Sequence, residues 1–197
     1  MKASNILLIA AAAITLASCG GSEEATAEKT SYTLDVNSST LKWKGSEGPE
    51  YFHVGSIKFI DGSLEMEGDK LTTGTFTIDM NSITVEDKEL PDEKKGYLAE
   101  HLKDTSFFFI ADFPKVTVSI DGYEGGKLST TINVRGQEIK ENIPVKLTSN
   151  EKSVSISGKF SIDFAALKMM GMEPDPESGD KIDSKIEYDL LLNLNKK

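Results

Sequence analysis

The chain has 197 residues, with 22 basic and 32 acidic side chains and a net charge of -10. This acidity excludes a general nucleic-acid-binding role, because the phosphate backbone repels such a surface. The length suits one domain of ordinary size, and the single cysteine, Cys19, excludes an internal disulfide.

The N-terminus has the pattern of an export signal. A basic start at Lys2 precedes an apolar, alanine-rich run over residues 6–16. This run is far shorter than the ~20 residues that a membrane-spanning helix needs. Leu16-Ala17-Ser18-Cys19 then resembles the lipobox of bacterial lipoproteins, which implies cleavage before Cys19 and lipidation of that residue. We therefore expect residues 1–18 to be a lipoprotein signal peptide, with an ordinary secretory signal as the alternative.

Residues 19–30 are predicted to be a disordered acidic tether, because this segment has nothing that can form a core. The folded domain is then expected over residues 31–197. Gly20 stands where enterobacterial lipoproteins commonly carry the Asp that retains them in the inner membrane, which favours the outer membrane. Ser22-Glu23-Glu24 resembles the acidic surface-export tags of Bacteroidetes-like bacteria. Both the periplasmic side and the cell surface therefore stay open.

Alternating polar and apolar residues predict strands through the first half of the domain, over residues 32–36, 40–45, 51–60, 63–67 and 71–80. Gly55 marks a bulge in this pattern. Asp61-Gly62 predicts a hairpin turn, and Gly68-Asp69 predicts the next turn.

A charged stretch over residues 83–95 breaks this alternation. Pro91-Asp92 begins a predicted helix that ends at His101 or Leu102. The uncharged run Phe107-Phe108-Phe109-Ile110 follows. The alternation of polar and apolar residues then resumes and predicts further strands over residues 116–120, 128–134, 138–147, 153–164 and 182–194. A methionine-containing segment at residues 165–180 separates the last two of these strands. Roughly eight or nine strands with mostly short turns indicate an all-β, antiparallel sandwich or barrel.

The sequence carries few signals for catalysis. It has no G-x-S-x-G, Walker A or paired C-x-x-C motif. The only histidines are His53 and His101, and no carboxylate stands at a ligand spacing from them, so we predict no metal site. Both histidines could still point into one cavity. An enzyme that modifies a lipid or quinone, with His53 and His101 as acid and base, is therefore one alternative.

The apolar signal is stronger. A small barrel either fills its interior with side chains or encloses one ligand, and aromatic and methionine residues suit a flexible, lipid-like ligand. The predicted lining residues are Trp43, His53, Phe76, Phe107, Phe108 and Met169. His53 is suited to hydrogen-bond a polar head such as a quinone carbonyl. A filled core uses the same residue types, so a ligand-free structural module at the surface is a second alternative.

The order of several short motifs resembles the YceI family of lipocalin-like periplasmic proteins, over residues 32–194. The matching pieces are Tyr32-x-Leu34-Asp35, Leu41-x-Trp43, His53-x-Gly55-x-Ile57-x-Phe59, Asp61-Gly62, Gly74-x-Phe76-x-Ile78-Asp79-Met80, Ser82-Ile83, His101-Leu102, Phe107-Phe108, Phe113-Pro114 and Val134-x-Gly136. The resemblance implies an extended eight-stranded antiparallel barrel with a short helix near one end. It also implies a long apolar tunnel for an isoprenoid chain, and no established enzymatic activity. The chain departs from the family at Asp163-Phe164-Ala165-Ala166 and in the methionine-rich loop at residues 167–172.

Together these observations predict a lipid-anchored binding protein of the cell envelope. It would hold an isoprenoid or other amphiphilic lipid, of quinone or polyprenyl type, for transport, storage or sequestration. Lipidated Cys19 would attach it to the membrane. No catalytic residue, covalent cofactor or nucleic-acid partner is expected, and a homodimer is left open.

Overall fold

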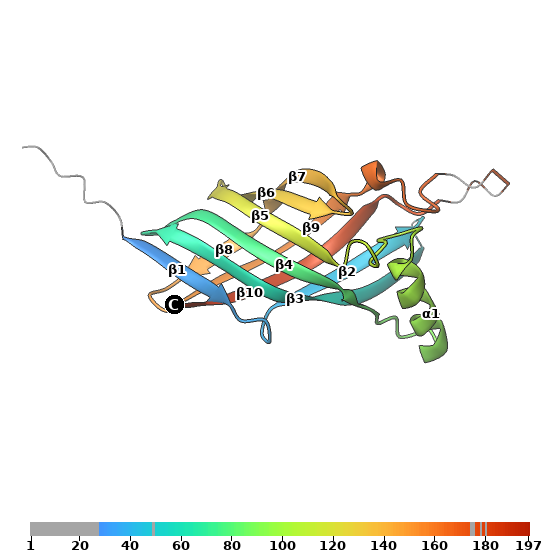
Figure 1. Ribbon diagram of the computed structural model, residues 1–197, viewed down its shortest axis with the longest axis horizontal. Helices are drawn as coiled ribbons and strands as arrows, with labels where there is room; N and C mark the ends of the chain where they lie inside the picture. The colour runs from blue at the N-terminus through green and yellow to red at the C-terminus, as the bar shows by residue number, and fades with distance from the viewer. Residues whose placement is uncertain (1–27, 49, 174–175, 178, 180) are drawn as a thin grey trace, which may run out of the picture.

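A computed structural model gives the fold and describes residues 28–48, 50–173, 176–177, 179 and 181–197. In this part of the chain, ten strand segments form one antiparallel sheet that curls into an elongated barrel (Figure 1). The strands are β1 (Lys29–Leu34), β2 (Thr40–Glu47), β3 (Tyr51–Glu67), β4 (Lys70–Val85), β5 (Lys115–Glu124), β6 (Lys127–Val134), β7 (Gln137–Pro144), β8 (Lys146–Ser149), β9 (Ser153–Asp163) and β10 (Lys185–Lys196). The helix α1 (Asp92–Lys103) precedes β5, and a 3-10 turn, η1 (Ala165–Leu167), follows β9.

The ten segments are two more than the eight strands that the resemblance implied, because two strand positions are broken. β1 and β2 both pair with β3 and with β10, so they are successive parts of one position, interrupted at residues 35–39. β7 and β8 are also consecutive and meet at Pro144-Val145, where proline cannot donate to a ladder. β7 pairs with β6 and β8 pairs with β9, which brings the two ends of the sheet together along one stretch of chain.

The predicted hairpin turn at Asp61-Gly62 is wrong. β3 continues through both residues, and they pair with Thr77 and Phe76 of β4. A Cβ on Gly62 would lie 2.4 Å from the Phe76 ring, so this glycine makes room for a core side chain. The chain turns after β3 at Gly68-Asp69, which confirms the other predicted turn.

Three further boundaries differ from the sequence prediction. The register shift near Gly55 falls between Ser56 and Lys58 rather than at the glycine. β4 extends into the charged stretch as far as Val85, because its inner face stays apolar there. β1 begins at Lys29, inside the predicted tether, since Lys29 and Thr30 pair with β3. The rest of the predicted signal peptide and tether, residues 1–27 with Cys19, lies outside the described residues.

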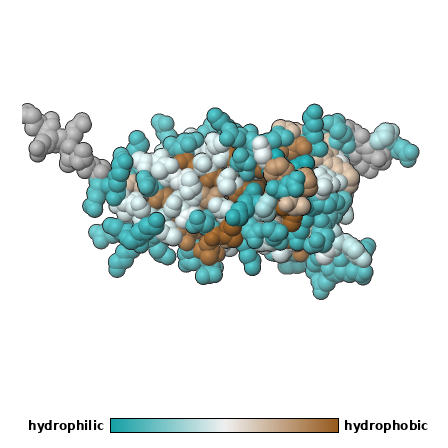
Figure 2. All heavy atoms as spheres, viewed as in Figure 1, coloured by the Kyte–Doolittle hydropathy of each residue, from teal (hydrophilic) through white to brown (hydrophobic). Residues whose placement is uncertain are grey.

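The two ends of the barrel are built differently. Fully buried aliphatic side chains close the end where β1 begins, among them Leu64, Met66, Leu71, Ile156 and Leu194. α1 lies across the opposite end (Figure 1), and its Leu98 and Leu102 pack against the core. Hydrophilic residues cover much of the outer face, with a few hydrophobic patches between them (Figure 2). No helix in the described part of the chain is long and apolar enough to cross a membrane.

Candidate ligand-binding site

An apolar cavity of about 90 Å³ lies inside the barrel. Strand alternation builds it, because residues two apart on a strand face the same side of a sheet. β4, for example, contributes Phe76, Ile78 and Met80 to the lining. Thr130 also faces this cavity, but its hydroxyl donates to the Glu141 carbonyl at 2.9 Å. The lining therefore suits hydrocarbon and leaves few polar groups free.

A second, larger cavity of about 280 Å³ lies at the end of the barrel under α1. We call it the mouth cavity. Five of the six predicted lining residues surround it, from four separate parts of the chain: Trp43, His53, Phe107, Phe108 and Met169. The sixth, Phe76, lies deeper and lines the inner cavity. The structure thus brings these side chains together, and their role toward a ligand stays a prediction.

A layer of aromatic rings separates the two cavities. The rings of Phe108 and Tyr188, together with the aliphatic Ile57, line both of them. Each ring meets Phe164 edge-on, with ring centroids 6.4 Å apart, and Tyr188 also stacks on Phe160 at 5.7 Å. The backbone of Phe108 is held by a 3.1 Å hydrogen bond from its N–H to the Leu102 carbonyl at the end of α1. A ligand that reaches from the mouth into the barrel must pass this layer.

Tyr188 was not among the predicted lining residues, although alternation along β10 with the apolar Ile186 and Leu190 indicates its inner face. Its hydroxyl makes no hydrogen bond within the described residues. Burial raises the pKa of Tyr188, because the phenolate would lose its hydration there. Tyr188 therefore presents a neutral hydroxyl at the boundary between the two cavities.

The raised pKa of Tyr188 predicts a loss of stability in alkali. Above pH ~10 the unfolded chain releases the phenolic proton while the folded chain keeps it, so the free energy of unfolding falls as the pH rises. Tyr188→Phe should reduce this alkaline decline, measured as urea midpoints across the alkaline range. It should also remove the last step of the absorbance titration of tyrosinate. Identical pH profiles for the two proteins would contradict the assignment.

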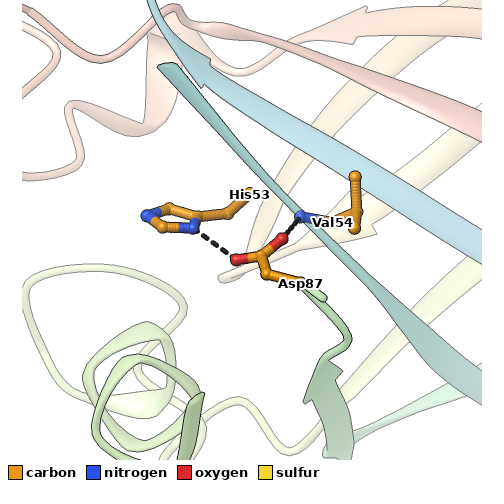
Figure 3. Close-up of polar contacts among 3 residues, drawn as sticks. All are labelled: His53, Val54 and Asp87. Carbon is orange, nitrogen blue, oxygen red and sulfur yellow. Dashed lines mark hydrogen bonds and ion pairs between the residues drawn. The ribbon is translucent and has the colours of Figure 1, made fainter. Parts of the chain in front are cut away.

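His53 is held by a carboxylate at the edge of the mouth cavity (Figure 3). Its Nδ1 lies 2.6 Å from Oδ2 of Asp87, whose Oδ1 accepts the backbone N–H of Val54 at 2.7 Å. The Asp87 side chain is only 12% exposed, and that of His53 is 23% exposed. Both carboxylate oxygens are therefore occupied, and the other ring nitrogen of His53, Nε2, points away from Asp87 (Figure 3).

His101 lines the same cavity from the last turn of α1. Its Nδ1 lies 3.1 Å from Oδ2 of Asp104, and its ring meets Phe107 edge-on at 4.9 Å. The pKa of Asp104 is lowered, chiefly by the backbone N–H of Ser106 that its carboxylate accepts. Within the described residues, no group of three or more His, Cys, Asp or Glu side chains is placed to hold a metal ion.

Trp43 forms one wall of the mouth cavity and packs against Gly55, its partner in register on β3. A Cβ on Gly55 would lie 2.7 Å from the indole and 1.8 Å from the Thr84 carbonyl oxygen. The indole Nε1 is buried and has no hydrogen-bond partner within the described residues. Gly55 thus allows a bulky ring to lie flat against the sheet.

Comparisons with known proteins agree with this architecture. A family model described as the YceI-like domain matches residues 32–192. The structure is similar to a polyisoprenoid binding domain from Saccharophagus degradans implicated in plant cell wall breakdown, with a TM-score of 0.62, 16% identity, and coverage of 85% of this chain and 99% of that one. It is also similar to BcnA of Burkholderia cenocepacia, with a TM-score of 0.64, 15% identity, and coverage of 81% and 98%. At these identities the two structures show the fold alone. A search of curated proteins gave no significant match.

Proposed function

Because the chain belongs to the YceI-like domain family, we propose that it binds the isoprenoid tail of an amphiphilic lipid, of quinone or polyprenyl type, inside its barrel. The observation that carries the proposal is the apolar inner cavity, which meets a larger mouth cavity at the Phe108 and Tyr188 rings. The tail would enter the barrel, and the head would stay under α1. A similar structure is described as a polyisoprenoid binding domain, which supports the same ligand class.

The energetics of tail burial are sufficient for such a ligand. Each CH₂ moved from water to an apolar site contributes ~0.8 kcal/mol. A tail of a few isoprene units therefore reaches about micromolar affinity after the costs of association. Because the lining offers little hydrogen bonding, the tail would be chosen by size and flexibility rather than by directional contacts.

The experiment that tests this proposal is native mass spectrometry of the purified protein, together with organic extraction of whatever co-purifies. We expect a noncovalent lipid adduct that disappears after extraction, and rebinding of an added isoprenoid quinone. A protein that carries no lipid and binds none on addition would contradict the proposal. That result would favour a ligand-free structural module instead.

The second candidate is an enzyme acting on the same lipid or quinone. One observation favours it: His53 and His101 line one cavity, and each has its own carboxylate partner, as acid–base groups often do. In that case His53→Gln would abolish turnover while the lipid still bound. The binding proposal expects no turnover by the wild-type protein.

The position of the mouth bears on how the protein would be anchored. β1 begins at Lys29, which pairs with Glu67. The mouth residue His53 lies near the other end of β3, about 45 Å away along the strand. The start of β1 and the mouth therefore lie at opposite ends of the barrel (Figure 1). We propose that lipidated Cys19 attaches the protein to the outer membrane, on its periplasmic side or at the cell surface, with the mouth turned away from the anchor.

Cys19→Ser tests the anchor. The substitution removes the sulfur that the lipobox resemblance predicts to be lipidated, so the protein should move from the detergent phase to the aqueous phase on detergent partitioning. The melting temperature of the barrel should not change, because β1 begins ten residues later, at Lys29. Unchanged partitioning into detergent would contradict the lipoprotein interpretation.

A further inference from the structure

The polar groups around the mouth cavity form one cluster. Trp43 pairs in register with Gly55 on one side and with Tyr188 on the other. His53 stands two residues before Gly55 on β3 and lines the same cavity. Within the described residues, three polar groups on neighbouring strands have no hydrogen-bond partner: the indole N–H of Trp43, the hydroxyl of Tyr188, and Nε2 of His53.

The surroundings of His53 determine which kind of hydrogen bond it offers. Oδ1 of Asp87 is occupied by the Val54 N–H, and Oδ2 faces Nδ1 of the imidazole. A carboxylate is an acceptor, so Nδ1 carries the proton that points to Asp87. In the neutral imidazole, the lone pair then lies on Nε2. When its imidazole is neutral, His53 therefore accepts a hydrogen bond from a ligand hydroxyl through Nε2. The Trp43 indole N–H and the Tyr188 hydroxyl are donors on residues that line the same cavity.

The charges at the mouth argue against an anionic head. Glu47 and Asp183 belong to the lining, and no lysine or arginine does among the described residues. Lys44, nearby on β2, is already paired with Glu187 at 3.2 Å. The C-terminal end of α1, which carries partial negative charge, also lies at this cavity. A phosphate would find neither the cations nor the helix N-terminus that usually bind it.

We propose that the mouth cavity selects isoprenoid lipids whose head is a neutral hydroxyl, donated to Nε2 of His53, over ethers and phosphates with the same tail. This inference rests on the proposed function and specifies its ligand class. Two sources share the chemistry: an isoprenoid alcohol, and the reduced, quinol form of an isoprenoid quinone. Asp87 is a positioning residue here, since it acts through the histidine.

The test compares probes that differ only in the head. The full chain is titrated at mildly alkaline pH with geranylgeraniol, its methyl ether and geranylgeranyl phosphate, and binding is followed by calorimetry. We expect the alcohol to bind at least roughly tenfold more tightly than the ether, which cannot donate, and the phosphate to bind most weakly. A quinone and its quinol with one common tail form the second arm. Preference for the quinol would identify that source. Equal quinone and quinol affinities, together with tighter binding of the alcohol than of its ether, would identify the alcohol, and equal affinities within both pairs would overturn the inference.

Variants of the dyad assign the preference to His53. His53→Phe should make the affinities for the alcohol and the ether equal, and its far-UV circular dichroism should match that of the wild type and report an intact fold. Asp87→Asn should reduce the same preference. The Val54 N–H needs the amide oxygen as its acceptor, so the amide NH₂ would face Nδ1 of His53. The imidazole proton would then lie on Nε2, which could no longer accept the ligand hydroxyl. Equal binding of all three probes, or tightest binding of the phosphate, would overturn this inference and leave the proposed function standing. Failure of every probe to bind would overturn both.

Discussion

Gly55→Ala is expected to lower the melting temperature by roughly 6–12 °C. The added Cβ would lie 1.8 Å from the Thr84 carbonyl oxygen and 2.7 Å from the Trp43 indole. A backbone oxygen in a ladder cannot move without separating β3 from β4, so overpacking should cost about 3 kcal/mol. At this chain length, each kcal/mol corresponds to roughly 2–4 °C. Trp43 is the single tryptophan, so its emission should also report displacement of the mouth wall.

Gly96→Ala is the matched control for this substitution. Gly96 lies inside α1, where an added Cβ meets nothing within 4 Å. Alanine is favoured over glycine in a helix by roughly 0.5–1 kcal/mol, so this variant should melt slightly above the wild type. Circular dichroism melts of the two variants measure the difference. Equal melting temperatures would show that Gly55 is not confined by its neighbours.

Most of the strands could be predicted from the sequence, because polar and apolar residues alternate within each of them. Phe76, Ile78 and Met80 read as one face in the sequence, and all three line the inner cavity. Asp61-Gly62 misled for a physical reason: a glycine in a long strand gives the same local signal as a glycine in a turn. Its role depends on the Phe76 ring of the next strand, which no short stretch of sequence contains.

The candidate site was predictable only in part. Aromatic and histidine side chains that end up around the mouth were recognisable by type, and Trp43, His53 and Phe108 do gather there. Asp87, however, lies 34 residues from His53 in the sequence, within a stretch that reads as a charged loop. Only the pairing of β3 with β4 brings the carboxylate beside the imidazole. Hydrogen-bond partners set by register between strands cannot be read from spacing.

Phe108→Asp should abolish isoprenoid binding while the barrel stays folded. Phe108 lines both cavities, so in the free protein its replacement can be hydrated from the mouth. A bound tail would exclude that water and leave a carboxylate in an apolar space, which costs several kcal/mol. We therefore expect binding of an isoprenoid quinone to weaken by at least roughly 100-fold, or about 3 kcal/mol. Far-UV circular dichroism should stay close to that of the wild type.

Two further aspartate substitutions serve as controls for Phe108→Asp. Leu64 is 0% exposed and lines neither cavity, so Leu64→Asp buries a charge in the filled end of the barrel and should unfold the domain. Ile60 is 45% exposed, so Ile60→Asp should change neither fold nor binding. If Phe108→Asp unfolds as Leu64→Asp does, the aromatic layer is packed core rather than a passage for the tail. If it binds the quinone as Ile60→Asp does, Phe108 does not stand in the ligand's path. Weak binding by a folded Phe108→Asp protein would show that the tail packs against Phe108, where the mouth cavity meets the inner cavity.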